Sequence, residues 1–287
     1  MSIVLDGRET ARQIRAEVQQ RVRDLVAKGH PAPHLAAVLV GDDPASATYV
    51  SMKHKACSWV GITSSVHRLP GDANQEEVEN LVAALDADPT VHGILVQHPL
   101  PRHLNEQAVL DRVSLAKDVD GLSSASMGAL VAGVPAFRAC TPLGIVELLE
   151  RYGIPIVGKH AVVAGRSIIL GKPVALLLLE RHATVTICHS RTVGLPDLTL
   201  QADILVAAVG KPELIKGSMI KEGAVVVDAG YNRVEGRQGD VGDVEYETAA
   251  LRASYITPVP GGVGPMTIAM LLRNTVAAAE MAVGLHR

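Results

Sequence analysis

Apolar residues recur every three or four positions near the start of the chain, and strand-like runs follow them. From Ala11 to Leu25 this spacing predicts a helix over about Gly7 to Lys28, which Gly29 ends. Alternating short and long apolar patterns then predict buried strands separated by helices, which favours a parallel sheet covered on both faces. The expected strands are Leu35–Val40, Ile62–Leu69 and His92–Gln97, and the expected helices are Pro44–Val60 and Asn74–Leu85.

The same alternation returns after a predicted helix over about Thr141–Tyr152. Its strands are expected at Ala161–Ala164, Thr184–Cys188, Asp203–Ala207 and Ala224–Asp228, and a long helix is expected from Met266 to about Gly284. We therefore predict an α/β fold of two α/β lobes, the second a Rossmann-like dinucleotide-binding domain, with a cleft between them. The first domain comprises residues 1–138, joined by the C-terminal helix at about 266–284, and the second comprises residues 139–265.

The composition is that of a globular protein and excludes several functional classes. Hydrophobic residues make up 48% of the 287 positions and charged residues 20%, and the net charge is −3 without a basic run. Nucleic acid is therefore not an expected partner. The three cysteines are scattered and no His-Glu-x-x-His motif occurs, so neither a metal nor a disulfide framework is expected. The lack of a signal-peptide pattern and the charged residues in the last helix predict a cytoplasmic protein without membrane attachment.

The segment from Thr257 to Thr267 is the densest cluster of proline and glycine, which fill six of its eleven positions. Proline restricts φ, and glycine lets a ligand approach the backbone closely. The segment leads into the last predicted helix, with Pro265 suited to its first turn. A rigid loop before a helix N-terminus favours an anionic or amide-rich ligand, although a tight structural turn would have the same composition.

A glycine turn follows the predicted strand that ends at Ala164. Gly165 permits the turn and Gly171 allows a helix to start close to the sheet, which is the phosphate-binding corner of a dinucleotide fold. The spacing is not the usual Gly-x-Gly-x-x-Gly, so a plain strand-to-helix turn remains an alternative. The next strand ends in Cys188-His189-Ser190-Arg191, without the acidic residue that holds the ribose of NAD. Because Arg166 and Arg191 can donate to a 2′-phosphate, we predict NADP rather than NAD.

Tyr49 and Lys53 lie four residues apart on a predicted helix, so both side chains can face one site. A buried lysine can exchange protons near neutrality, although many surface helices carry this pair without a function. Short-chain dehydrogenases also use Tyr-x-x-x-Lys, but there the pair follows the dinucleotide turn, whereas here it precedes that turn.

Two further polar residues stand at positions where α/β proteins bind ligands. Gln97 ends a predicted strand, and ligands collect at the carboxyl ends of such strands, although a glutamine there can also tie a loop. Asp120 lies in an Asp-Gly turn, which turn formation alone would explain. Its carboxylate is also a natural bidentate partner for an amino-pyrimidinone edge such as that of a pterin.

Together these sites closely resemble the bifunctional methylenetetrahydrofolate dehydrogenase/cyclohydrolase family. The matching segments extend over nearly the whole chain in the family's order, so the resemblance is far more specific than any single motif. They are Pro44–Ser46 with Tyr49 and Lys53, Gly93–Pro101, Lys117–Leu122, Cys140–Gly144, Gly165–Pro173, Gly210–Pro212, Gly242–Val244 and Thr257–Thr267.

The resemblance implies an enzyme of one-carbon metabolism, with purine biosynthesis among the uses of its product. NADP would oxidise 5,10-methylenetetrahydrofolate to the methenyl form, and water would open that product to 10-formyltetrahydrofolate. Lys53 would handle the proton of the hydrolysis, Gln97 would tune it, and Tyr49 would orient the folate. Asp120 would bind the pterin of the tetrahydrofolate, in a folate-binding catalytic first domain.

The resemblance also implies further binding residues and a homodimer. Folate would contact Ser46 and the loop residues Pro260, Gly261 and Gly262. The cofactor NADP would be held by a larger set, namely Gly165, Arg166, Ser167, Ser190, Arg191 and Tyr231. The chain departs from the family pattern at His98, Ile168 and Tyr231, which bears on relative rates rather than on the class of reaction.

Two alternatives remain open from the residues alone. One is a dehydrogenase of the same architecture that acts on another small substrate, such as an amino acid or a shikimate-type acid. The other is a non-catalytic nucleotide-sensing protein that has kept the fold. The joint presence of Tyr49, Lys53, Gln97 and Asp120 disfavours both, because neither would need this set.

Overall fold

The computed structural model describes residues 2–237 and 239–285, and their contacts divide the chain into two compact units. The residues up to Arg12 and Thr141–Thr267 form one unit, here named the six-stranded unit. Gln13–Cys140 and the residues from Ile268 onward form the other, here named the three-stranded unit. None of the helices in the described part of the chain has the length and apolarity needed to traverse a bilayer.

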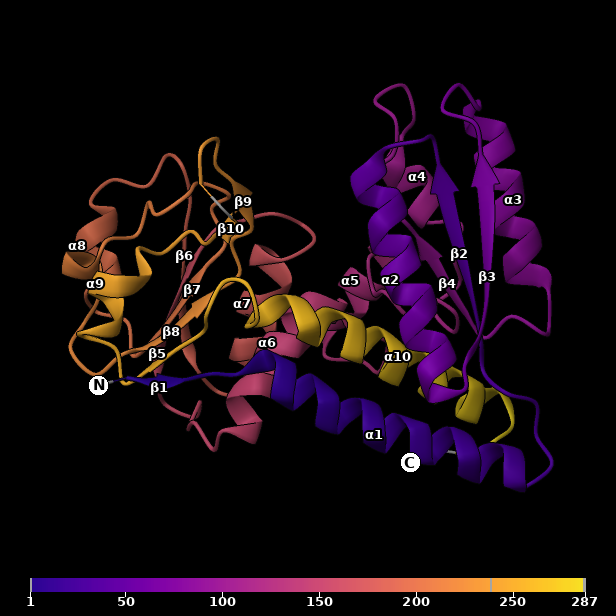
Figure 1. The fold of residues 1–287 in the computed structure, drawn as a ribbon, viewed down its shortest axis with the longest axis horizontal. Helices are drawn as coiled ribbons and strands as arrows, with labels where there is room; N and C mark the ends of the chain where they lie inside the picture. The colour runs from indigo at the N-terminus through magenta and orange to yellow at the C-terminus, as the bar shows by residue number, and fades with distance from the viewer. Residues whose placement is uncertain (1, 238, 286–287) are drawn as a thin grey trace. The chain divides into compact units, whose positions relative to one another are not determined.

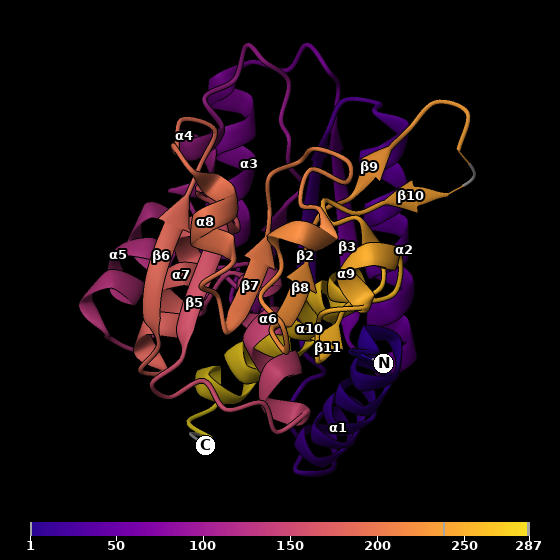
Figure 2. The same cartoon turned by 90° about the vertical axis from the view of Figure 1, so that its left-hand side faces the viewer.

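The six-stranded unit is built on a parallel sheet with the strand order β1-β11-β8-β7-β5-β6, and Figure 2 shows β6 at one edge of it. Strands β7 and β8 are buried along their whole length, as expected for a parallel sheet covered on both faces. The strands are β1 (Ile3–Val4), β5 (His160–Ala164), β6 (Thr184–Cys188), β7 (Ile204–Ala207), β8 (Val225–Asp228) and β11 (Tyr255–Ile256).

The helices of this unit and a small hairpin occupy the connections between the strands. The core under them is made of small aliphatic side chains such as Val162, Leu205 and Val226, all fully buried. The helical elements are α6 (Cys140–Arg151), α7 (Gly171–Glu180), α8 (Leu195–Thr199), η1 (Gly217–Met219) and α9 (Tyr246–Ala250), and the hairpin pairs β9 (Asn232–Arg233) with β10 (Asp240–Val241).

The three-stranded unit has a parallel sheet in the order β3-β2-β4, with the buried strand β2 in the middle (Figure 1). Its strands are β2 (His34–Val40), β3 (Thr63–Leu69) and β4 (Gly93–Val96), and its helices are α2 (Pro44–Val60), α3 (Gln75–Ala87), α4 (Glu106–Leu110) and α5 (Ser124–Ala132). Helix α2 packs on β2 and β3, while α3 packs on β2 and β4. Each of these two helices therefore packs against β2, the central strand of the sheet.

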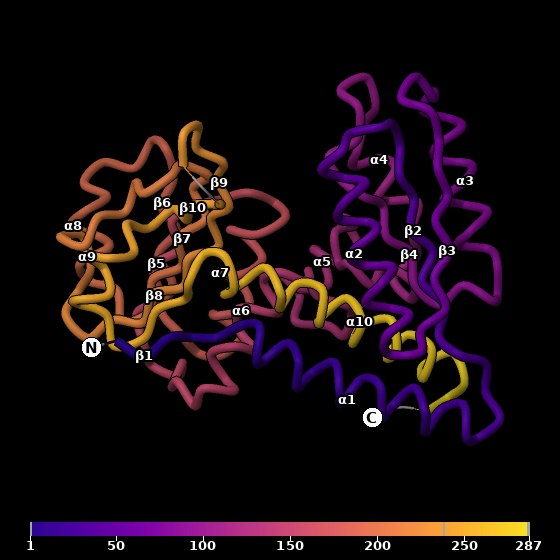
Figure 3. Tube along the Cα trace, viewed as in Figure 1, coloured from indigo at the N-terminus to yellow at the C-terminus, as the bar shows by residue number. Residues whose placement is uncertain are grey.

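Two long helices, α1 (Gly7–Ala27) and α10 (Val263–Ala282), begin in the six-stranded unit and continue in the other. In the three-stranded unit they lie side by side (Figure 3). There Arg21 of α1 forms an ion pair with Glu280 of α10. Helix α10 starts three residues before the predicted Met266, because Pro265 fits a first helical turn, where its missing N–H is not needed.

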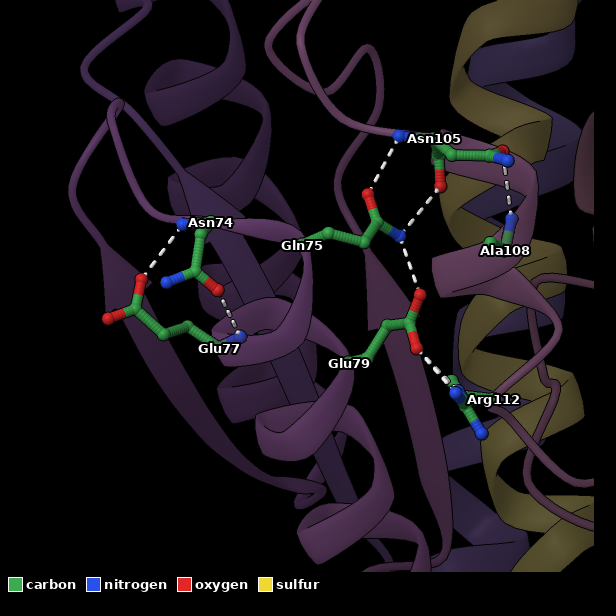
Figure 4. A network of polar contacts seen from close by, with 7 residues as sticks. All are labelled: Asn74, Gln75, Glu77, Glu79, Asn105, Ala108 and Arg112. Carbon is green, nitrogen blue, oxygen red and sulfur yellow. Dashed lines mark hydrogen bonds and ion pairs between the residues drawn. The ribbon is translucent and has the colours of Figure 1, made fainter.

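A polar network fixes the start of α3 against the loop that follows β4 (Figure 4). Asn74 and Glu77 form a capping box, in which each side chain accepts the backbone N–H of the other residue. Gln75 and Asn105 exchange two hydrogen bonds, since Gln75 accepts the N–H of Asn105 and donates to its carbonyl. The loop that begins with Gln97 is therefore anchored at its far end.

Candidate active site

Lys53 stands on α2, and the local sequence explains why that helix forms there. Asp43 caps the helix by accepting the backbone N–H of Ser46 at 2.8 Å, and Pro44 occupies its first turn. Val50 and Cys57 are buried on the inner face, which leaves Lys53 half-buried at the rim of the sheet. The Lys53 Nζ donates a hydrogen bond of 3.0 Å to Oε1 of Gln97.

Gln97 follows β4 and is buried, with 6% of its surface exposed. Its Nε2 donates to the carbonyl oxygen of His98 at 2.7 Å, so the amide oxygen must face Lys53. The partner at residue 98 is a backbone atom. The departure of His98 from the family pattern therefore leaves the orientation of Gln97 intact.

Ser46 and Tyr49 lie on the same side of α2 as Lys53, at helical spacing from it. Ser46 is buried beside the helix N-terminus, whereas 39% of the surface of Tyr49 is exposed. The exposed phenol ring is open to stack on a planar ligand. The three side chains are grouped by their shared face of the helix.

The Cys140 thiol lies near both Asp120 and Lys53. Burial raises the pKa of Cys140 well above its usual value, the charge of Asp120 and a hydrogen bond to it raise it further, and the charge of Lys53 lowers it. The thiol is therefore within electrostatic range of both side chains. Asp120 itself is half-buried, and its carbonyl accepts the backbone N–H of Cys140 at 3.3 Å. Lys53, Gln97 and Asp120 thus belong to one polar region of the three-stranded unit.

The glycine turn after β5 has no room for a side chain. Gly165 has φ +142°, and a Cβ built on it would lie 2.2 Å from the carbonyl oxygen of Ala208, while one on Gly171 would lie 2.3 Å from the carbonyl of Gly165. Ser167 accepts the N–H of Gly171 through its hydroxyl, at 3.2 Å, and so braces the start of α7. A tightly turned backbone with glycines at both positions, beside a helix N-terminus, suits a pyrophosphate.

The cationic residues of the predicted cofactor site surround this turn. Ala164 and Cys188 are register partners on adjacent strands, so Arg166 and the segment containing Ser190 and Arg191 leave the sheet at the same edge. All three of these side chains are exposed. They are free to meet a phosphate, and β6 ends without a carboxylate that would compete.

Tyr231 and the Pro-Gly loop follow the next strands of the same sheet. Tyr231 comes after β8 and is 59% exposed. In the loop, Gly261 and Gly262 are buried while Pro260 is exposed. The carbonyl of Gly261 accepts the N–H of Arg8 at 3.1 Å, which ties the loop to the start of α1.

Two buried carboxylates hold the loops at the carboxyl ends of these strands. The sequence motifs did not single out either of them. Asp243 accepts the backbone N–H groups of Val209, Gly210 and Lys211 and the amide of Asn232. Asp228 accepts three N–H groups, from Gly230, Asp243 and Val244. The two carboxylates thereby fix the segments after β7 and β8. Their signals in the sequence are weak, because Asp228 ends β8 two residues before Gly230 and Asp243 follows Gly242 after β10, and many turns share such patterns.

The site and the sheet define a class of protein, namely a dinucleotide-binding oxidoreductase whose three-stranded unit carries a paired lysine and glutamine. Residues 139–283 match the model of the tetrahydrofolate dehydrogenase/cyclohydrolase NAD(P)-binding domain, and residues 5–120 match the model of the catalytic domain of the same family. The chain belongs to the tetrahydrofolate dehydrogenase/cyclohydrolase family.

Individual relatives agree with this assignment over the full length. The chain is 60% identical over 277 residues to the bifunctional protein FolD of Moorella thermoacetica, covering 96% of this chain and 98% of the relative. A crystal structure of bifunctional FolD from Campylobacter jejuni superimposes with a TM-score of 0.96 at 46% identity, covering 98% and 99% of the two chains. The structure of FolD from Trypanosoma brucei, solved with NADP and an inhibitor, superimposes with a TM-score of 0.93 at 38% identity, covering 98% of each chain.

These matches confirm the predicted family, the α/β fold of two lobes with a Rossmann-like second lobe, and an enzyme that uses a nicotinamide dinucleotide. The roles assigned to individual residues stay predictions.

Proposed function

We propose that the chain oxidises 5,10-methylenetetrahydrofolate to 5,10-methenyltetrahydrofolate with NADP and hydrolyses that product to 10-formyltetrahydrofolate. The hydrogen bond of 3.0 Å from Lys53 Nζ to Gln97 Oε1 carries this proposal. It places an oriented amine in the unit that matches the family's catalytic domain. A dehydrogenase alone would not need such a proton acceptor.

The glycine turn fits NADP, because only glycine at position 165 lets the chain turn so close to Ala208 without a side chain in the way. The pyrophosphate would lie against Gly165, Ser167 and the N-terminus of α7, and the 2′-phosphate would meet Arg166 and Arg191. When bound, NADP supplies the hydride acceptor. Ser190 and the backbone of Tyr231 complete the proposed set.

In the hydrolysis, Lys53 acts as the proton acceptor. Water adds to the methenyl carbon of the cationic substrate, and the Lys53 amine takes the proton that the water loses. The ring nitrogen is released as the carbon becomes a formyl group, so 10-formyltetrahydrofolate and one proton are produced. Gln97 keeps the amine aimed at the carbon through its amide oxygen, which accepts one of the amine hydrogens.

The folate would be held mainly by the three-stranded unit. Asp120 offers a carboxylate to the amino-pyrimidinone edge, and the exposed ring of Tyr49 offers a stacking surface. Ser46 and the loop of Pro260, Gly261 and Gly262 provide further contacts. In these terms residues 1–138 with the helix at 266–284 form the folate-binding domain, and residues 139–265 form the NADP-binding domain.

A cytoplasmic homodimer fits the remaining surface features. Strand β6 is the last in its sheet, and apolar side chains near it are exposed, with 56% of Leu179, 44% of Ile187 and 93% of Val193 accessible. A second copy could add to this edge. The three cysteines are free, buried thiols, as is usual in a reducing compartment. Sedimentation of an Ile187→Lys variant as a monomer would support the dimer, and an unchanged sedimentation coefficient would contradict this placement.

The substitution Lys53→Met separates the two reactions. Methenyltetrahydrofolate and NADPH are followed by absorbance after mixing methylenetetrahydrofolate with NADP. The variant should still form the methenyl product but hydrolyse it at least about a hundredfold more slowly, as expected for a lost general base. Lys55→Met, two residues along the same helix and exposed, serves as the control. If both reactions slowed to the same degree, or if neither slowed, the role of Lys53 would be contradicted.

A further inference from the structure

The carboxylate of Asp118 is buried, with 3% of the residue exposed, and the chain that follows it supplies all of its partners. One oxygen accepts the backbone N–H groups of Gly121 at 3.0 Å and Leu122 at 3.2 Å. The other accepts the N–H of Ser123 at 2.9 Å and the hydroxyl of Ser126 at 2.6 Å. A buried carboxylate with four donors is a strong local tie, because hydrogen bonds to a charged acceptor are the stronger kind.

Asp120 lies inside the turn that these bonds close. On its C-terminal side, Gly121 has φ +69°, and a Cβ there would lie 2.4 Å from the carbonyl carbon of Arg138. On its N-terminal side, the carbonyl of Val119 accepts from the amide of Asn274 at 2.9 Å and from the Cys140 thiol at 3.3 Å. The peptide groups on both sides of Asp120 are therefore held, and Asp118 holds the later one.

The three charged residues of the segment 117–120 have different partners. Lys117 donates from Nζ to the carbonyls of Asp86 and Asp88, each at 2.6 Å, and so closes the end of α3. Asp118 has its acceptor positions filled within the turn. Asp120 is half-buried beside Cys140, within the polar region that contains Lys53. The side chains of Lys117 and Asp118 are thus both bound to other groups of the protein.

We propose that Asp118 is a positioning residue that holds the Asp120 carboxylate in the orientation that binds the amino-pyrimidinone edge of the folate. The proposal rests on the function proposed above for Asp120. Asp118 does not touch the ligand itself, since its carboxylate is buried and occupied. Its substitution by asparagine replaces one acceptor oxygen with an NH₂ group that would face N–H or O–H donors, so the turn relaxes and the aim of Asp120 is lost.

The test compares tetrahydrofolate binding, at saturating NADP, among the wild type, Asp118→Asn, Asp120→Ala and the double variant. Calorimetry should show binding weakened by about tenfold in Asp118→Asn, the effect of losing charge-assisted hydrogen bonds. The double variant should bind no more weakly than Asp120→Ala, because Asp118 acts only through Asp120. The Kd of NADP should be unchanged. A purely stabilising role would lower the melting temperature without this non-additivity.

A nearby carboxylate provides the matched control. Asp111 accepts the N–H of Ser124 at 2.7 Å and its hydroxyl at 2.9 Å, so it ties the same loop just beyond the turn. Asp111→Asn should lower stability and leave tetrahydrofolate binding unchanged. If Asp118→Asn does not fold, Ser126→Ala removes one of the four donors to Asp118 and should give a smaller loss that is also absent in the Asp120→Ala background.

The outcomes distinguish the positioning role from the underlying function. Unchanged binding in Asp120→Ala would remove Asp120 from the folate site, and the proposed function would need another pterin partner. Weakened binding in Asp120→Ala together with an unaffected Asp118→Asn would overturn the positioning role alone. So would losses that multiply in the double variant, since they would show two independent effects.

Discussion

At the scale of single residues, the amide of Gln97 decides how Lys53 is presented. Its nitrogen is committed to the carbonyl of His98 and its oxygen to the Lys53 amine, so only one orientation satisfies both partners. A glutamine is neutral and places no charge beside the amine. A carboxylate at the same place would pair with the ammonium form instead.

The substitution Gln97→Glu should therefore slow the hydrolysis and move its pH dependence. A negative charge 3.0 Å from Nζ would keep Lys53 protonated to higher pH, so the rising limb of the hydrolysis rate should shift upward in pH. Gln97→Ala is the matched variant, since it removes the acceptor and adds no charge. It should lower the rate without the pH shift, and an equal shift in both variants would contradict the electrostatic explanation.

The proposed preference for NADP over NAD also depends on single residues. Arg166 is exposed next to the glycine turn, and its guanidinium can donate two hydrogen bonds to a 2′-phosphate. Arg166→Ala should reduce the ratio of kcat/KM for NADP to that for NAD by roughly tenfold to a hundredfold, the usual effect of lost charge-assisted hydrogen bonds. Lys172→Ala removes an exposed cation at the start of α7 and should leave the ratio nearly unchanged. Steady-state kinetics with both cofactors decides, and an unaltered ratio in Arg166→Ala would exclude its contact with the phosphate.

Sequence reasoning selected residues whose chemistry is unusual for their position and overlooked residues that serve the backbone. Lys53 and Gln97 were expected in one site, and the structure joins them although 44 positions separate them. Asp118 and Asp243 were not singled out. A carboxylate that accepts backbone N–H groups looks in sequence like any turn aspartate, because its partners are main-chain atoms that every residue carries.

At the scale of elements, the turn after β5 depends on two close approaches of backbone to backbone. Gly165→Ala would place a Cβ 2.2 Å from the carbonyl oxygen of Ala208, which follows β7, so the two strands would have to separate. We expect NADP affinity to fall by about a hundredfold or more, since the cradle and the strand spacing are disturbed together. Fluorescence titration with NADPH measures this affinity for the cofactor.

Gly158→Ala is the control for this change. Gly158 also has a positive φ, of +72°, but a Cβ there meets nothing within 4 Å. Its substitution should cost about 1 kcal/mol of stability, from the left-handed conformation alone, and should not affect NADPH binding. If Gly165→Ala bound NADPH as tightly as the wild type, the steric argument would be wrong.

Elements with clear ends or long periodic patterns could be predicted, and short ones could not. Helix α2 has the predicted bounds, because Asp43 with Pro44 marks its start and Gly61, with φ +85°, marks its end. The strands agree to within a residue or two. Short helices such as α8 and α9, with five residues each, contain too few positions to show a period.

At the scale of the whole molecule, the connections between distant segments left no local signal. Strand β1 has two residues and pairs with β11, which comes from the other end of the chain. The residues up to Arg12 are consequently grouped with Thr141–Thr267. The apolar pair Tyr255-Ile256 is strand-like in sequence, but two residues give no indication of their partner, so the pairing depends on the folded sheet and not on the pattern of either segment.

The stability of the molecule should depend on pH through Asp228 in an unusual direction. Burial raises the pKa of Asp228 to about 6, and Asp243 adds to the rise, while three backbone N–H groups oppose it. The folded state thus holds a proton between about pH 4 and pH 6 that the unfolded chain has released. The contribution of Asp228 to stability is present at low pH and is lost as the pH rises through 6.

Urea unfolding of the wild type and Asp228→Asn, from pH 3 to pH 8, isolates this contribution. The stability of the wild type relative to the variant should decrease by an amount of order 3 kcal/mol between pH 4 and pH 7. Asp203→Asn is the control with the opposite sign, because hydrogen bonds from Lys221 and from the N–H of His160 lower the pKa of Asp203. The wild type should keep its advantage over Asp203→Asn above pH 5 and lose it only as the pH falls below about 4. A difference for Asp228→Asn that stays constant, or that grows with pH, would mean that this buried carboxylate is ionised throughout and that its three N–H donors outweigh its burial.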